Sequence, residues 1–106
     1  MRLFLILLVL CTGSLARAQS VQVTSGEHDG FSRLVLTFPA TTDWQFGRTE
    51  AGYKLVTNDK NPSYNLSDVY RRLSRKRLSA IFTDPADGAL HLGVSCLCHA
   101  IPFEFR

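Results

Sequence analysis

The chain has 106 residues with 12 Lys+Arg against 9 Asp+Glu, a formal net charge of +3 and 45% hydrophobic residues. This length fits one small domain, and so small a net charge identifies no class of partner. The sequence contains no glycine-rich phosphate loop, no paired-carboxylate motif and no nucleophile elbow. We therefore expect a protein that is not an enzyme and that requires no cofactor.

Residues 1–18 have the order of a secretory signal peptide. Met1-Arg2 precedes an apolar run from Leu3 to Leu10, and a small-residue site follows at Ala16-Arg17-Ala18. The apolar run is shorter than the roughly 20 residues that span a bilayer. The sequence thus predicts cleavage after Ala18, a secreted protein located in the periplasm, and no transmembrane segment in the mature chain. Residues 19–106 would form a single small β-rich domain.

The first half of this domain shows two predicted β-hairpins. The segments 21–24 and 31–38 alternate apolar and polar residues on either side of Asp29-Gly30, a strong hairpin signal. The segments 44–46 and 53–57 are joined by a glycine-containing loop. Alternation along these strands predicts inward-facing side chains, which are Leu34, Leu36, Phe38, Trp44, Phe46, Tyr53 and Leu55.

Residues 67–82 are the one stretch with a helical pattern. Ser67 or Asp68 can cap its start, and an apolar face begins at Val69. The apolar residues after Leu73 do not continue this helical face. Ser74 lies where the pattern changes and could cap a second helix. This pattern favours two short helices over one long helix.

The last segment, from Ala89 to Arg106, is predicted to begin as a strand that runs through Cys98. Pro102 interrupts the alternation, and Phe103 and Phe105 resume it as a short final strand. We thus predict an α+β, mostly β fold: a small antiparallel sheet or sandwich of about six short strands with one or two short helices inserted at 67–82. We also expect an incomplete domain, truncated at its C-terminus, or a final edge that a partner completes.

Cys96-Leu97-Cys98-His99 is the one motif that could carry chemistry. On a straight strand the two cysteine Cα atoms lie about 6.6 Å apart and their Cβ atoms a similar distance, whereas a disulfide requires Cβ atoms about 3.8 Å apart. The strand must therefore bend for a bond to form. Three interpretations remain open: small buried cysteines or a structural disulfide, a redox-active pair of Cys96 and Cys98, and a metal site made by Cys96, Cys98 and His99.

A basic run spans the predicted break between the two helices. Its members are Arg71, Arg72, Arg75, Lys76 and Arg77. Such a run is either a solvated helix face or a site for an anionic envelope surface or an acidic partner. Secretion argues against a nucleic-acid partner.

Two parts of the chain resemble known proteins. The segment GEHDGFSRLVL, residues 26–36, is similar to the opening hairpin of AMIN-type domains, which are periplasmic β modules. The mature chain also resembles the N-terminal portion of long, uncharacterised periplasmic proteins of alphaproteobacteria; the matching words are WQFGRT at 44–49, CLCHA at 96–100 and FEFR at 103–106. These resemblances imply a module that binds cell-wall glycan or another envelope protein, and they assign no catalytic residue.

Three hypotheses of function follow. The first is a non-enzymatic binding or scaffolding module of the cell envelope. The second is a redox-active or metal-binding envelope protein that uses the Cys-x-Cys-His motif. The third is a truncated fragment without a function of its own.

Overall fold

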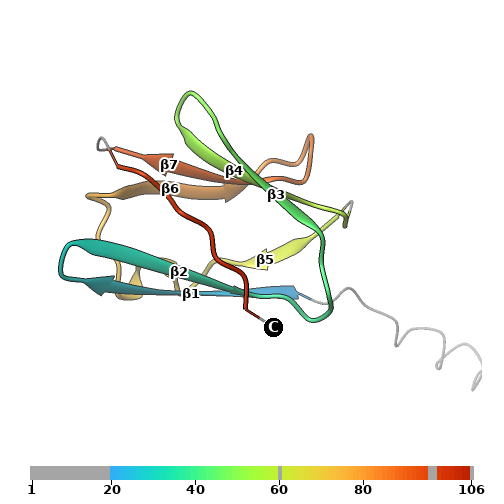
Figure 1. The fold of residues 1–106 in the computed structure, drawn as a ribbon, viewed down its shortest axis with the longest axis horizontal. Coiled ribbons are helices and arrows are strands. Elements are labelled where there is room, and N and C mark those ends of the chain that lie inside the picture. Colours follow the sequence, from blue (N-terminus) through green and yellow to red (C-terminus); the bar gives the residue numbers. More distant parts are fainter. Residues whose placement is uncertain (1–19, 60, 96–97, 106) are drawn as a thin grey trace, which may run out of the picture.

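The computed structural model describes residues 20–59, 61–95 and 98–105, so the predicted signal peptide lies outside the described residues. The described chain forms two β-sheets joined by loops and one 3-10 turn (Figure 1). One sheet has the strand order β2-β1-β5 and the other has the order β3-β4-β7-β6. The predicted fold class, mostly β with little helix, is confirmed.

The three-stranded sheet is built on the first predicted hairpin. Strands β1 (Ser20–His28) and β2 (Phe31–Thr37) pair antiparallel up to His28 opposite Phe31, which leaves Asp29-Gly30 as a two-residue turn. Gly30 has φ of +86°, a backbone conformation that favours glycine. The third strand, β5 (Ser63–Asn65), pairs parallel to the start of β1. It has only three residues, too few for an alternating pattern to be recognised in the sequence.

The four-stranded sheet contains the second predicted hairpin, β3 (Trp44–Arg48) and β4 (Gly52–Thr57), followed by β7 (Leu90–Val94) and β6 (Leu78–Thr83). All its neighbouring strands are antiparallel. The inward orientation predicted for β4 is confirmed, because Tyr53 and Leu55 are buried. The Phe46 ring stacks on Tyr53 with centroids 5.1 Å apart.

The hydrophobic core lies between the two sheets. Its buried cluster draws on β1, the 3-10 turn η1 (Val69–Arg71), the segment that follows it and β6, and consists of Val23, Val69, Leu73 and Leu78. Partly buried residues pack around it, namely Leu34, Leu36, Tyr64, Leu66, Tyr70, Ile81 and Leu92. Val69 is fully buried, and the Ser25 hydroxyl donates a hydrogen bond to its carbonyl oxygen, so η1 is held against β1.

The helical prediction for residues 67–82 is correct only at its start. The predicted first helix is the single 3-10 turn η1, but the predicted second helix is wrong because Leu78–Thr83 form strand β6. Leu78 pairs with Val94 and Ala80 with Gly93, so Ser79 is an extra residue in β6, a β-bulge. The bulge lets Leu78 and Ile81 both face the core although they are three residues apart, a spacing that in sequence imitates a helix.

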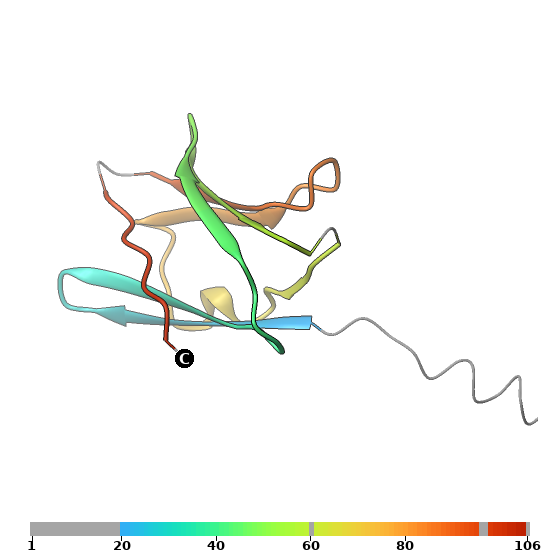
Figure 2. The ribbon, with the colours of Figure 1, turned by 45° about the vertical axis from the view of Figure 1, so that its right-hand side comes forward.

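The segment after β7 also differs from the prediction. Strand β7 ends at Val94, and residues 98–105 belong to no strand, so the predicted strand through Cys98 and the predicted final strand at Phe103–Phe105 are wrong. Residues 98–105, here called the C-terminal strap, run across the side of the sandwich on which the edge strands β2 and β3 lie (Figures 1 and 2). In the described part of the chain, no helix has the length and apolar character needed to cross a membrane.

Candidate functional site

The Cys-x-Cys-His motif is only partly described. Cys98 is a disulfide-bonded, half-buried residue at the start of the C-terminal strap, and His99 beside it is exposed. Cys96 lies outside the described residues, as does Cys11. Within residues 20–59, 61–95 and 98–105, the one group of three potential metal ligands contains neither Cys98 nor His99. The redox and metal roles predicted for Cys96, Cys98 and His99 remain predictions.

The predicted basic surface is divided by local contacts. The Arg75 guanidinium lies 3.8 Å from the centroid of the Tyr70 ring, a cation–π contact. Arg77 forms an ion pair of 2.6 Å with Glu27, which ties this segment to the end of β1. Arg71 pairs with Asp68 at 3.4 Å. These three arginines therefore have partners within the chain that partly neutralise or cover their charge.

The other two basic residues are exposed. Arg72 lines an open hollow of about 410 Å³ together with Arg33 of β2, and Glu27 also lines it. Lys76 lies in the turn that precedes β6. An anionic partner would meet positive charge from Arg72 and Lys76 and from Arg33, a residue that the sequence pattern did not single out.

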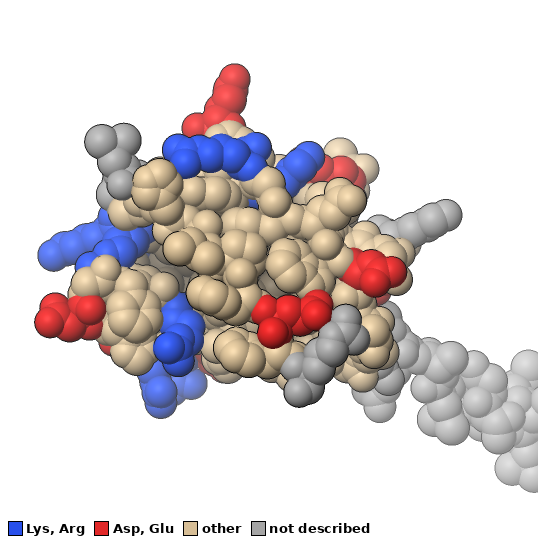
Figure 3. Space-filling view, viewed as in Figure 1, with Lys and Arg blue, Asp and Glu red and all other residues tan. Residues whose placement is uncertain are grey.

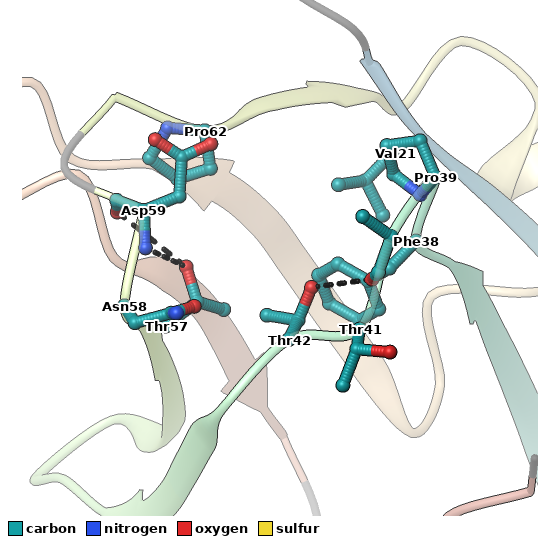
Figure 4. Close-up of a pocket in the computed structure, with 10 residues that line it drawn as sticks. Val21, Phe38, Pro39, Thr41, Thr42, Thr57, Asn58, Asp59 and Pro62 are labelled. Atoms are coloured by element: carbon teal, nitrogen blue, oxygen red, sulfur yellow. Dashed lines mark hydrogen bonds between the residues drawn. The ribbon is translucent and has the colours of Figure 1, made fainter.

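A small pocket, here called the end pocket, opens at the end of the sandwich where β2 leads to β3 and β4 leads to β5 (Figure 4). Its volume is about 230 Å³. Its lining is mainly neutral, with apolar side chains beside hydroxyl and amide groups, and comprises Val21, Phe38, Pro39, Ala40, Thr41, Thr42, Thr57, Asn58, Asp59 and Pro62. Thr42 donates a hydrogen bond of 2.9 Å to the Ala40 carbonyl oxygen, which shapes one wall.

Tyr64 of β5 is the described tyrosine with a shifted pKa. Burial raises the pKa of its phenol, more than the Thr57 side chain lowers it, and the negative charge of Asp59 acts in the same direction as burial. The hydroxyl therefore stays protonated at neutral pH and can act as a hydrogen-bond donor. Asp59, whose charge acts on the Tyr64 phenol, also lines the end pocket.

Two hydrogen bonds tie the C-terminal strap to the second hairpin. The Trp44 indole N–H donates a hydrogen bond of 2.7 Å to Glu104 Oε1, and the Ala100 backbone N–H donates one of 3.2 Å to the Tyr53 hydroxyl. Both anchors lie on the second hairpin, on β3 and β4. Trp44 and Tyr53, two of the four side chains predicted to face inward on this hairpin, therefore also hold the strap, which sequence alternation alone did not indicate.

Three apolar side chains on the strap face solvent. Ile101 is 72% exposed, Phe103 is 76% exposed and Phe105 is 90% exposed. The face that the strap crosses is mostly uncharged at its centre, with Lys and Arg gathered toward its left and upper margins (Figure 3). These three side chains alternate along the strap, so they add apolar surface to this face of the molecule.

The sequence pattern did not predict one cluster of ionisable groups that the structure brings together. Asp84, Asp87 and His91 bring three potential metal ligands together at the loop between β6 and β7. The sequence contains the spacing Asp-x-x-Asp-x-x-x-His. The two aspartates stand beside Pro85 and Gly88, however, and this context indicates a turn rather than a metal site. The β6–β7 hairpin places the two aspartates beside His91, the second residue of β7.

Comparison of the chain with family models, with curated proteins and with solved structures returns no match.

Proposed function

We propose that this chain is a non-enzymatic binding module of the cell envelope, and that it holds a partner envelope protein through the C-terminal strap. The observation that carries this proposal is the exposure of Ile101, Phe103 and Phe105, which is 72%, 76% and 90%. The predicted signal peptide supports the location, since it directs the chain into the periplasm.

The strap has the properties of a docking segment. It is extended, and the described residues 98–105 belong to no strand of either sheet. The Ala100 N–H is bound to the Tyr53 hydroxyl, so a partner strand would pair with the segment that follows Ala100. Main-chain hydrogen bonds to an added strand give affinity, and alternate side chains fit pockets that give specificity. Phe103 and Phe105 are spaced two residues apart, so they project to one side of such an augmented strand. A partner with an exposed strand edge and apolar pockets is the chemistry that fits.

Site-specific photo-crosslinking tests this proposal. With the photoreactive p-benzoylphenylalanine in place of Phe103, cells that export the protein should yield one dominant crosslinked species. The matched control places the same group at Phe31, which is also an exposed aromatic residue, at 47%, but lies at the β1–β2 turn. The proposal requires that the crosslinked species forms when the photoreactive group is at position 103 and does not form when it is at position 31. The same crosslinks at both positions, or none at position 103 in correctly exported protein, would contradict it.

A cell-wall glycan at the end pocket is the second candidate function. The neutral mixture of threonine hydroxyls, the Asn58 amide and apolar rings suits a sugar, which offers both hydroxyl groups and apolar ring faces. We expect soluble peptidoglycan fragments to bind the wild-type chain and to bind the N58A variant at least about 5-fold more weakly, in keeping with one lost hydrogen bond. Calorimetric titration measures this. Replacing Phe103 with serine should leave the affinity unchanged, and equal affinity of wild type and N58A would contradict the site.

A further inference from the structure

The cluster at the β6–β7 loop, here called the loop cluster, consists of Asp84, Asp87 and His91. One donor atom from each of the three side chains lies within 4.8 Å of the others. The two aspartates stand in the loop and the histidine stands on β7, so a short hairpin fixes all three. This cluster lies outside the C-terminal strap and the end pocket.

The loop fixes both carboxylates by the same kind of contact. Asp84 Oδ1 accepts a hydrogen bond of 2.9 Å from the Ala86 backbone N–H, and Asp87 Oδ1 accepts one of 2.9 Å from Ala89. Each carboxylate thus keeps its second oxygen, Oδ2, for another partner. Both Oδ2 atoms point at His91 Nε2, from 3.9 Å and 3.8 Å.

His91 Nε2 has no partner within hydrogen-bond distance among the described residues, although less than 1 Å² of this atom is exposed. The two carboxylate distances exceed the 2.7–3.2 Å range of a hydrogen bond to nitrogen. A stack on Phe82, with centroids 5.2 Å apart and planes 8° apart, holds the imidazole in this orientation. Buried nitrogen atoms almost always have a partner, and this atom, with a carboxylate oxygen at 3.9 Å and another at 3.8 Å, is placed to bind a ligand together with them.

We propose that the loop cluster binds a divalent transition-metal ion, Zn²⁺ in the first place, through His91 Nε2 and the Oδ2 atoms of Asp84 and Asp87. Zinc sits roughly 2.0–2.2 Å from nitrogen and carboxylate oxygen, so two ligands at the tetrahedral angle are about 3.4 Å apart. The distances from His91 Nε2 to the two carboxylate oxygens, 3.9 Å and 3.8 Å, need to close by about half an ångström, and the separation of the two carboxylate oxygens, which is within 4.8 Å, by up to about 1.4 Å. The imidazole selects against Ca²⁺ and Mg²⁺, which prefer ligands that are all oxygen.

The site has an open side. Asp84 and Asp87 are 38% and 45% exposed, so solvent reaches the ion and can supply a fourth, water ligand. The Asp87 carboxylate is oriented by the hydrogen bond that its Oδ1 accepts from the Ala89 backbone N–H. Lys54 of β4 pairs with His91. Its positive charge repels a cation that approaches the site.

Zinc titration of the full chain, purified with its disulfide intact, tests the proposal. Calorimetry with a zinc salt should show one ion per chain, and Zn²⁺ should raise the melting temperature. The H91Q variant should bind at least about 100-fold more weakly, and D84N and D87N at least about 10-fold more weakly, because each loses one ligand. H99Q is the matched histidine control and should bind as the wild type does.

Three results would overturn the proposal. The first is that the wild type binds no zinc at 0.1 mM Zn²⁺, a concentration that corresponds roughly to the highest dissociation constant expected of a preformed site. The second is equal affinity of wild type and H91Q, and the third is a loss of affinity in H99Q instead of H91Q. Melting curves in chelator identify a folding defect, since D84N should melt within about 4 °C of the wild type there, the shift that corresponds to a surface change of at most about 0.5 kcal/mol.

Discussion

Replacement of Gly52 by alanine should destabilise the domain by about 3–5 kcal/mol, enough to leave much of the chain unfolded at 37 °C. A Cβ atom at this position would lie 2.1 Å from the Leu92 carbonyl oxygen and 3.1 Å from the Val94 backbone nitrogen. Both atoms belong to the backbone of β7, so no rotation of a side chain relieves the overlap. Overpacking against side chains costs about 1–3 kcal/mol, and a clash with paired backbone should exceed that. Urea unfolding followed by circular dichroism measures the change.

Gly47 offers the matched control, because it lies in the neighbouring strand β3 of the same sheet. A Cβ atom there meets nothing within 4 Å. The G47A variant should therefore stay within about 1 kcal/mol of the wild type, since alanine removes only backbone freedom. Equal stability of the two variants would mean that β4 and β7 do not approach each other as described.

Truncation of Leu90 to alanine should cost about 3 kcal/mol, within the 2–5 kcal/mol range for buried leucine. Leu90 is 1% exposed and pairs with Leu55 on β4 and Thr83 on β6, so it stands between two strands at the centre of the four-stranded sheet. Its removal leaves a cavity that paired strands cannot close by moving together. The midpoint of urea unfolding should fall with little change in slope.

Ile101 is the control for this truncation, since its change to alanine also removes three carbon atoms. Ile101 is 72% exposed on the C-terminal strap. The I101A variant should change the free energy of unfolding by less than about 0.5 kcal/mol, as surface substitutions do. A large loss in I101A would show that the strap contributes to the core, and a small loss in L90A would contradict the burial of Leu90.

The hairpins and the β-rich class could be predicted because their signals are local. Asp29-Gly30 defines a turn, and alternation on either side of it defines which residues face inward. The β6 strand could not be predicted, because the extra residue Ser79 shifts the apolar phase and only pairing with β7 reveals the shift. Residues 63–65 are a strand only because β1 offers them an edge. In both cases the deciding interaction is distant in sequence.

The candidate sites show the same difference between features that local sequence predicts and features that depend on distant segments. The sequence brought out Phe103 and Phe105 by their alternation but placed them in a strand, since nothing local shows that the chain passes across the sandwich instead. The basic run was visible, but its division by Glu27 and Tyr70 was not, because these partners come from other segments. The loop cluster needed the β6–β7 hairpin to be known before His91 could be joined to Asp84 and Asp87.

The anchor between Trp44 and Glu104 has a practical consequence. The chain contains a single tryptophan, and its indole N–H is bound to the strap. Indole emission responds to changes in polarity and hydrogen bonding at that nitrogen. The protein thus carries one tryptophan at the contact that holds the strap, so binding of a partner to the strap can be followed by indole emission in solution on the unlabelled chain.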